Sequence, residues 1–410
     1  MIKYVLYFSL ILYPIQTFDI NIQNTAFDIS SILISFSIIT LFFFSKKKIN
    51  IYTALIIFFI IYQLTIYIIS PAPFPRFLSA LYWITIFLMM FYIGEDFKID
   101  YIVFEKIIII ILFISCLICW YQYFFIITPE KYNLGIKLRA VAFFREPSYA
   151  GLSFYAASLG CIVKYFYDRE KLKYFLLFLI FFSTGLLTLS MHIVTFFLTI
   201  ITIYIFIIFK IDSNFFKKIL FLLTALLGFL VIIYITIYLI DKNFLEKITH
   251  HYLIRINIFD TETNSLSLLS WLRGLDQMLY SLKQTYIFGH GLGTTGEFYF
   301  PSVYGEKLTT YGLYSLTLKD AFSLFFRLVI EIGPIFTLLL LYKVFDITKN
   351  VLRETIKNKK IFNENIFVFL FAITIFVGSL IKEPNYARSS LFIAILILSS
   401  FIKKGEKIEK

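Results

Sequence analysis

KYFLLFLIFFSTGLLTLSMHIVTFFLTIITIYIFIIF, residues 173–209, is the stretch that decides the fold class. It is apolar almost throughout and is nearly twice as long as the roughly 20 residues that one membrane-crossing helix requires. We therefore expect two crossings joined by a tight turn near Ser190-Met191-His192. Only helices and closed barrels satisfy their backbone hydrogen bonds in lipid, and the lack of apolar–polar alternation favours helices.

The whole chain has the composition of a membrane protein. Its 410 residues are 60% hydrophobic and 20% aromatic, and the mean hydropathy is +0.83. A water-soluble core of this size needs far less apolar surface. The sequence therefore predicts an all-α, polytopic integral membrane protein of about twelve transmembrane helices. The expected spans are residues 3–17, 27–44, 51–70, 77–94, 103–127, 147–166, 173–189, 191–209, 219–240, 322–344, 365–381 and 389–402.

Basic residues in the short connections orient the chain. Lys and Arg collect in the cytoplasmic loops of membrane proteins, and here alternate connections carry them, as at residues 46–48 and 349–360. We expect a multi-pass protein of the inner (plasma) membrane with both termini in the cytoplasm. Residues 1–240 then hold the first nine expected helices, 241–321 form one large extracytoplasmic (periplasmic) loop domain, and 322–410 hold the last three helices and a cytoplasmic tail.

Basic residues in the expected outer connections break this rule, so they are the most informative about a possible functional site. A charge near the centre of a membrane helix costs about 2.5–3.5 kcal/mol on insertion scales, so it is paired or faces a polar cavity. One interpretation is structural pairing with Glu146, Glu331 and Glu383. The other is an anion site, because guanidinium groups bind phosphate and pyrophosphate bidentately. For Lys131 and Arg255 we favour a third interpretation, that they are solvated loop charges. The basic residues of the outer connections are Lys131, Lys137, Arg139, Arg145, Arg255, Arg273, Arg327, Lys382 and Arg388.

The segment RAVAFFREPSYAG, residues 139–151, stands at the start of the sixth expected span. Pro147 suits the first turn of a helix, where its missing N–H costs nothing. The free amides of Ser148 and Tyr149 and the positive end of the helix dipole would then face an outer pocket and favour an anion. The alternative is ordinary capping of this helix by Glu146.

The same segment resembles the Arg-x-x-x-x-Phe-x-Glu-Pro-Ser pattern of Wzy-type polysaccharide polymerases, in the O-antigen ligase and polymerase superfamily. Further features are similar to that family: a serine closing an apolar span, an outer-loop arginine followed by a glycine-rich turn, and a Glu-x-Gly sequence. The basic residue that often follows the family's serine is absent here. The matching positions are Ser190, Trp271-Leu272-Arg273, Gly289-His290-Gly291-Leu292-Gly293 and Glu331-Ile332-Gly333.

The resemblance implies a metal-independent glycosyltransferase without cofactor, a polymerase of O-antigen or capsular polysaccharide. It would join undecaprenyl-pyrophosphate-linked repeat units at the outer face of the membrane, within membrane lipid, beside a flippase and a chain-length regulator and without nucleic acid. Glu146 and His290 are the two candidates for the catalytic base that deprotonates the acceptor hydroxyl. Arg139, Arg145 and Arg273 would stabilise the leaving diphosphate electrostatically. The other predicted substrate-binding residues are Ser148, Tyr149, Arg327 and Arg388.

Other functions stay open at this point. An O-antigen ligase would transfer the glycan to lipid A core, but ligases usually carry a histidine after the glycine turn, and residues 319–323 lack one. A polysaccharide transporter or flippase commonly shows internal repeats, and we find no matching halves. A scaffold in a glycan-assembly complex is a further alternative. No outer Asp/Glu cluster has the spacing that holds a divalent cation beside a nucleotide sugar, so we expect a lipid-linked donor and no metal.

Overall fold

The computed structural model describes most of the chain on either side of residues 201–265. The expected span at 219–240 lies outside the described part, as do Arg139 and Arg145. The described residues are 2–14, 19–22, 25–44, 51–94, 99–126, 140–144, 146–167, 171–188, 190, 192–193, 195–200, 266–285, 288–297, 300–313, 315–316, 318–357, 359–382, 385–386 and 388–401.

Helices form the regular structure, apart from one short β-hairpin. Each expected span outside residues 191–240 contains a helix, which confirms the predicted all-helical class for the described residues. Two further helices, α12 (Leu266–Thr285) and α13 (Val303–Thr310), fall in the predicted outer loop. The others are α1 (Ile2–Leu12), α2 (Ile29–Phe44), α3 (Ile51–Ile69), α4 (Phe74–Ile93), α5 (Tyr101–Tyr121), α7 (Pro147–Tyr167), α8 (Lys171–Leu187), α14 (Leu324–Lys357), α15 (Lys359–Lys382) and α16 (Ser389–Ser399), with a π-helical turn at Gln122–Ile126.

The number of spans differs from the expected twelve. Among the described residues, 4 helices are long and apolar enough to cross a membrane, namely Phe74–Ile93, Tyr101–Ile126, Leu324–Val351 and Asn365–Lys382. These segments are compatible with a membrane protein, but they do not show twelve spans. Helix length is the reason for two of the expected spans: α1 and α16 have 11 residues each, well short of the roughly 20 that a crossing requires, although the apolar runs around them are longer. Length does not exclude α7, which has 21 residues but is not among the four.

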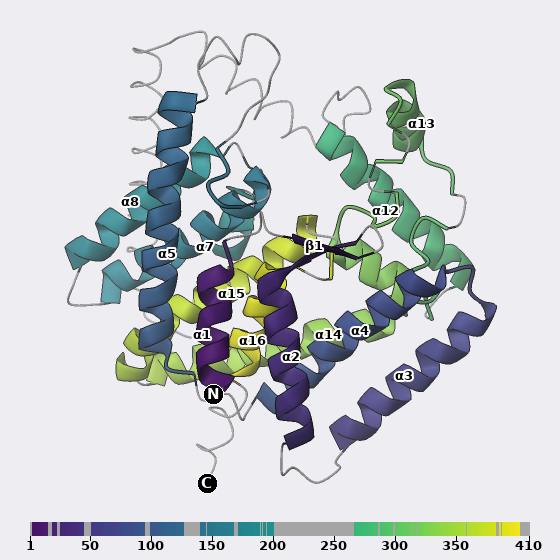
Figure 1. The fold of residues 1–410 in the computed structure, drawn as a ribbon, viewed down its shortest axis with the longest axis horizontal. Coiled ribbons are helices and arrows are strands. Elements are labelled where there is room, and N and C mark those ends of the chain that lie inside the picture. The colour runs from purple at the N-terminus through teal and green to yellow at the C-terminus, as the bar shows by residue number, and fades with distance from the viewer. Residues whose placement is uncertain are drawn as a thin grey trace.

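The helices α15 and α16 occupy the middle of the bundle (Figure 1). α5, α7 and α8 lie on one side of them, and α3, α4, α12 and α13 lie on the other. α15 packs against α7, α14 and α16, and α12 packs against α13 and α14. Every residue of α16 is buried, as expected of a helix that is apolar on all sides.

The chain reverses direction after α8, as the sequence predicts. α8 ends at Leu187, and helical structure resumes at His192. The rings of Phe182 and Phe196, on either side of this break, lie 5.4 Å apart between centroids. Ser190 sits in the break and packs closely on α7, since a Cβ added to Gly151 would lie 2.5 Å from the Ser190 Cβ.

The buried surface of α12 combines leucines with polar residues. Leu269 and Leu272 are buried, whereas Leu279 is exposed. The buried polar side chains of α12 are Ser270, Arg273, Gln277 and Ser281.

Candidate functional site

A break in α14 holds the glycine-rich turn in place. Gly333 has φ 82° and ψ 161°, outside the helical region, and Pro334 follows it. Because proline has no N–H, the carbonyl of Ile330, four residues earlier, loses its helical donor. The backbone N–H of His290 takes that place and donates to the Ile330 oxygen at 2.8 Å.

The glycines of this turn allow the close approach. The backbone N–H of Gly291 donates to the carbonyl of Glu331 at 3.0 Å. A Cβ on Gly289 would lie 2.5 Å from the Gly333 nitrogen, and Gly289 itself has φ +72°. Both its backbone conformation and its surroundings therefore require glycine. The Gly-His-Gly and Glu-x-Gly sequences meet here, which places two of the motifs found in the sequence side by side.

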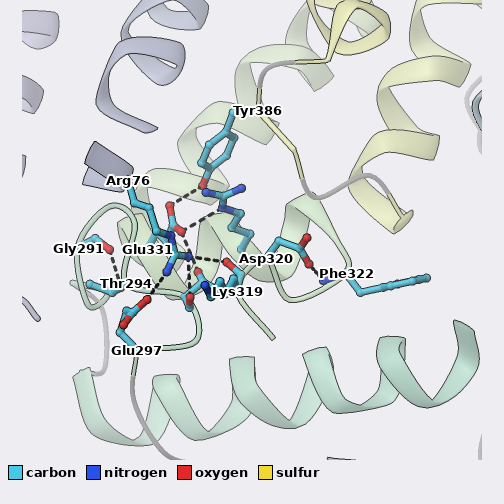
Figure 2. Close-up of polar contacts among 11 residues, drawn as sticks. Arg76, Gly291, Thr294, Glu297, Lys319, Asp320, Phe322, Glu331 and Tyr386 are labelled. Carbon is cyan, nitrogen blue, oxygen red and sulfur yellow. Dashed lines mark hydrogen bonds and ion pairs between the residues drawn. The ribbon is translucent and has the colours of Figure 1, made fainter. Parts of the chain in front are cut away.

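The carboxylate of Glu331 lies at the centre of a buried polar cluster (Figure 2). Its Oε1 accepts from Arg327 Nε at 3.0 Å and from the hydroxyl of Thr295 at 2.8 Å. Its Oε2 accepts from the hydroxyl of Tyr386 at 3.0 Å. The guanidinium of Arg327 also lies over the Tyr386 ring, 4.1 Å from the centroid. A buried charge is tolerated when it is paired and hydrogen-bonded in this way, so the cluster fixes the N-terminal part of α14.

Arg76 brings a second guanidinium to the loop that carries the glycine-rich turn, residues 289–297. It enters from the first turn of α4 and donates from Nη2 to the carbonyls of Thr295, at 2.9 Å, and Lys319, at 2.8 Å. Its Nη1 is ion-paired with Glu297 (Figure 2). The side chains of Arg76 and Glu297 are 24% and 27% exposed, so this ion pair, unlike that of Glu331, reaches solvent.

A further acidic residue, Asp320, lies among three arginines. Burial raises the pKa of its carboxyl above the ordinary value. A hydrogen bond from the Phe322 N–H, at 3.1 Å, and the charges of Arg327, Arg273 and Arg76 act in the opposite direction. Positive and negative groups therefore alternate through this region, and the arginines already have acidic neighbours.

Arg273 has a different environment from the one that the sequence predicts. Its side chain is buried, and its guanidinium donates to the carbonyl of Leu316. Its aliphatic part packs on α13, where a Cβ on Gly305 would lie 3.3 Å from the Arg273 Cδ. Arg273 thus ties α12 to α13 and to the loop that follows.

Arg388 and Tyr149 come together at a second position. The guanidinium of Arg388 lies 4.8 Å from the centroid of the Tyr149 ring. Its Nη1 pairs with Asp28 Oδ1 at 3.3 Å, and Asp28 Oδ2 accepts from the N–H of Ser389 at 2.9 Å. Asp28 is the last residue of the hairpin formed by β1 (Asp19–Ile22) and β2 (Thr25–Asp28). A residue from the N-terminal part of the sequence thus caps the first turn of α16.

Glu146 lies directly before α7, which begins at Pro147 as predicted. Its side chain is exposed, and its Oε2 accepts from the hydroxyl of Ser148 at 3.1 Å. Its carbonyl accepts the backbone N–H of Tyr149 at 3.2 Å and that of Ala150 at 3.3 Å. Glu146 thus serves as the cap residue that the structural interpretation anticipates, while its carboxylate faces solvent.

His290 is the titratable group of the turn. Burial lowers the pKa of its imidazole below 6.5. A neutral imidazole predominates near pH 7 as a result, and a neutral imidazole can accept a proton. His290 and Glu146 therefore both remain candidates for a general base.

The predicted site residues form two groups joined by the turn before α16. Tyr386 contacts Arg327 and Glu331, whereas Arg388, two residues later, contacts Tyr149. The pairing interpretation is confirmed for Arg327, which pairs with Glu331.

Sequence reasoning missed Arg76, Tyr386 and Asp28. The sequence contained a usable signal for Arg76, because this residue lies in a connection that is predicted to be outer, where basic residues are unexpected.

The described residues contain no group of three or more His, Cys, Asp or Glu side chains arranged to hold a metal ion. The arrangement instead brings together guanidinium groups and a neutral imidazole. No protein-family model matches this sequence, and no curated protein matches it either.

Proposed function

We propose that this chain is a glycan polymerase of the outer face of the plasma membrane, which joins undecaprenyl-pyrophosphate-linked repeat units into O-antigen or capsular polysaccharide. The family resemblance supplies the substrate class. The observation that carries the proposal is that one loop, residues 289–297, holds both a neutral histidine and a solvent-reaching arginine contact, His290 and Arg76–Glu297.

The loop is rigid enough to position both groups. The backbone of His290 and Gly291 bonds to α14, and Thr295 bonds to Glu331 through its hydroxyl and to Arg76 through its carbonyl. A substrate bound here would find its binding groups in place before it arrives, which lowers the entropic cost of the reaction.

In the proposed reaction, the diphosphate of the donor displaces Glu297 from Arg76. Exposed ion pairs contribute only about 0–1 kcal/mol, so an incoming diphosphate can exchange with the carboxylate at small cost. The acceptor hydroxyl loses its proton to His290 or Glu146 and forms a bond with the anomeric carbon. The bond from that carbon to the diphosphate breaks, and the lipid diphosphate leaves with its charge stabilised by guanidinium groups.

The membrane arrangement belongs to the same proposal. Cytoplasmic termini and an outer loop at 241–321 would put His290, Arg76 and Glu146 on the outer side. Cysteine labelling of intact cells tests this topology. A cysteine at Thr310, exposed on α13, should react with an impermeant reagent, whereas one at Ser45 should not.

Purified protein supplied with lipid-linked repeat units tests the activity. The proposal predicts a ladder of products that remain on the lipid diphosphate. Transfer of the glycan to lipid A core when both acceptors are present would identify a ligase. Translocation of the lipid-linked unit without a change in its length would identify a transporter.

A further inference from the structure

A small groove lies between α12 and α13, away from the glycine-rich turn. Its volume is about 330 Å³, near the lower end of the roughly 300–1,000 Å³ found for small-molecule sites. We call it the α12–α13 groove. Its lining includes Asp276, Tyr280 and Lys283 from α12 and Ser302, Val303 and Glu306 from the α13 side. Figure 1 shows the two helices together at the edge of the bundle.

The sequence of α12 places its groove residues on one face. Asp276, Tyr280 and Lys283 follow each other at steps of four and three residues, which line up along a helix. The carboxylate of Asp276 is held by the hydroxyl of Ser302, which donates to Oδ2 at 2.6 Å. Ser302 in turn accepts the N–H of Gly305 at 3.1 Å and caps α13. The groove therefore has a fixed geometry without a ligand.

Two carboxylates in the groove retain capacity to bind a ligand. Asp276 is bonded through Oδ2, and Oδ1 carries no hydrogen bond in the part of the chain that the structure describes. Glu306 is exposed and, within the same described ranges, forms no ion pair. Burial raises the pKa of the Asp276 carboxyl, while the Ser302 hydrogen bond lowers it. Ligand hydroxyl groups that donate hydrogen bonds to the Asp276 carboxylate would offset the cost of burying its charge.

The rest of the lining suits a sugar. The Tyr280 hydroxyl accepts from Gln284 Nε2 at 2.8 Å, which orients a flat apolar ring beside the carboxylates. Val303 adds exposed apolar surface. A pyranose presents adjacent hydroxyls at its edge and C–H groups on its face, and these match carboxylate acceptors and an aromatic ring. Asp276, Glu306 and Lys283 give the lining one net negative charge, which disfavours acidic sugars.

The groove is connected to the proposed reaction site through Arg273. This arginine precedes Asp276 by three residues on α12 and packs against Gly305 of α13. Its charge also acts on Asp320, which neighbours Arg327. A glycan held in the groove would thus contact α12 and α13, and Arg273 connects these helices to the charged residues beside the glycine-rich turn.

We propose that the α12–α13 groove binds a neutral or amino sugar unit of the glycan substrate, with Asp276 and Glu306 accepting hydrogen bonds from its hydroxyl or amino groups and Tyr280 covering its face. The identity of the glycan rests on the proposed function. The groove itself is a binding subsite, distinct from the residues assigned to bond formation.

Calorimetric titration of the purified full chain tests this subsite. The probe is the oligosaccharide that mild acid releases from the host cell's lipid-linked repeat units, free of its diphosphate lipid. Asp276→Asn keeps the hydrogen bond from Ser302, and Glu306→Gln changes an exposed residue, so both variants should fold. Each should weaken binding about tenfold or more, as expected when a charge-assisted hydrogen bond becomes neutral. Lys307→Gln removes a charge from the next residue of α13, outside the groove lining, and should change the affinity less than about twofold.

Unchanged affinity in Asp276→Asn and Glu306→Gln, or no binding by the wild-type chain, would overturn the groove proposal. A polymer ladder formed by a chain that fails this binding test would overturn the groove and leave the polymerase proposal intact. Groove-dependent binding without any ladder would support the groove and contradict the polymerase.

Discussion

The hydroxyl of Tyr386 donates to the buried carboxylate of Glu331 at 3.0 Å, and these residues come from the turn before α16 and from the kinked helix α14. The same tyrosine ring covers the guanidinium of Arg327. Burial raises the pKa of the Tyr386 hydroxyl well above its usual value, so the hydroxyl stays protonated and remains the donor. This contact joins the turn carrying Arg388 to the helix that holds the glycine-rich loop.

Replacing Tyr386 should separate its two roles. Tyr386→Phe removes one hydrogen bond to a buried charge and should lower the free energy of unfolding by about 1.5–3 kcal/mol. Tyr386→Leu also removes the ring over Arg327 and should cost about 1–2 kcal/mol more. Denaturant unfolding of the purified protein in micelles measures both values. Equal losses in the two variants would show that the ring contact contributes nothing.

Gly289 and Gly312 form a matched pair for testing the glycine-rich turn. Both have positive φ, +72° and +70°, but a side chain on Gly312 would meet nothing within 4 Å. Gly312→Ala should therefore lower the free energy of unfolding only by about 1–2 kcal/mol, which is what a left-handed backbone conformation costs a residue with a Cβ. Gly289→Ala should cost more and abolish activity, since the new Cβ would collide with α14. Similar stability and activity in both variants would contradict the turn described here.

The pH dependence of His290 has a defined sign. Because burial lowers its pKa below 6.5, the unfolded chain binds more protons than the folded one between the folded pKa and 6.5. Stability should fall as the pH decreases through that window and should not depend on His290 above it. His290→Gln should flatten the fall in unfolding temperature. If His290 is the base, the acidic limb of the rate profile should have its midpoint below 6.5, and a midpoint at or above 6.5 would argue against it.

The Asp28–Arg388 pair should behave as a buried ion pair. Asp28→Ala leaves the guanidinium without its carboxylate and should destabilise the protein by about 3–5 kcal/mol. Adding Arg388→Met removes the uncompensated charge, so the double variant should be more stable than Asp28→Ala alone. A double-mutant cycle on unfolding free energies measures this coupling. Additive losses would mean that the two residues act independently.

Local signals in the sequence predict much of the fold. Pro147 marks the start of α7, and the long apolar run with Ser190 at its middle predicts the reversal after α8. Hydropathy also finds the helices α4 and α5 within a few residues. Hydropathy misses the end of α14 at Lys357 and the start of α15 at Lys359, since the expected spans end at 344 and begin at 365. Hydropathy does not show where a helix ends within an apolar run. It therefore predicts full membrane spans for the short helices α1 and α16.

The candidate site depends on contacts between distant residues, and these have no local signal. Asp28 meets Arg388 across 360 residues of sequence, and Arg76 meets Glu297 across 221. Charged residues in outer segments identify candidates, but their partners are decided by helix packing. The sequence predicts Glu331 as a pairing partner for the basic residues, whereas its contacts with Tyr386 and Thr295 join distant segments and have no local signal.

The polymer ladder made by Arg76→Gln and Glu297→Gln is the most direct test of the central claim. If the donor diphosphate displaces Glu297 from Arg76, Arg76→Gln should lose elongation, whereas Glu297→Gln should keep or increase it because the competing carboxylate is gone. Glu297→Gln should stay within about 1 kcal/mol of wild-type stability, since the ion pair is partly exposed. Arg76→Gln also loses the hydrogen bonds to the carbonyls of Thr295 and Lys319 and should be destabilised further, by roughly 1–3 kcal/mol. Equal loss of the ladder in both variants, or a normal ladder in Arg76→Gln, would contradict the proposed anion site.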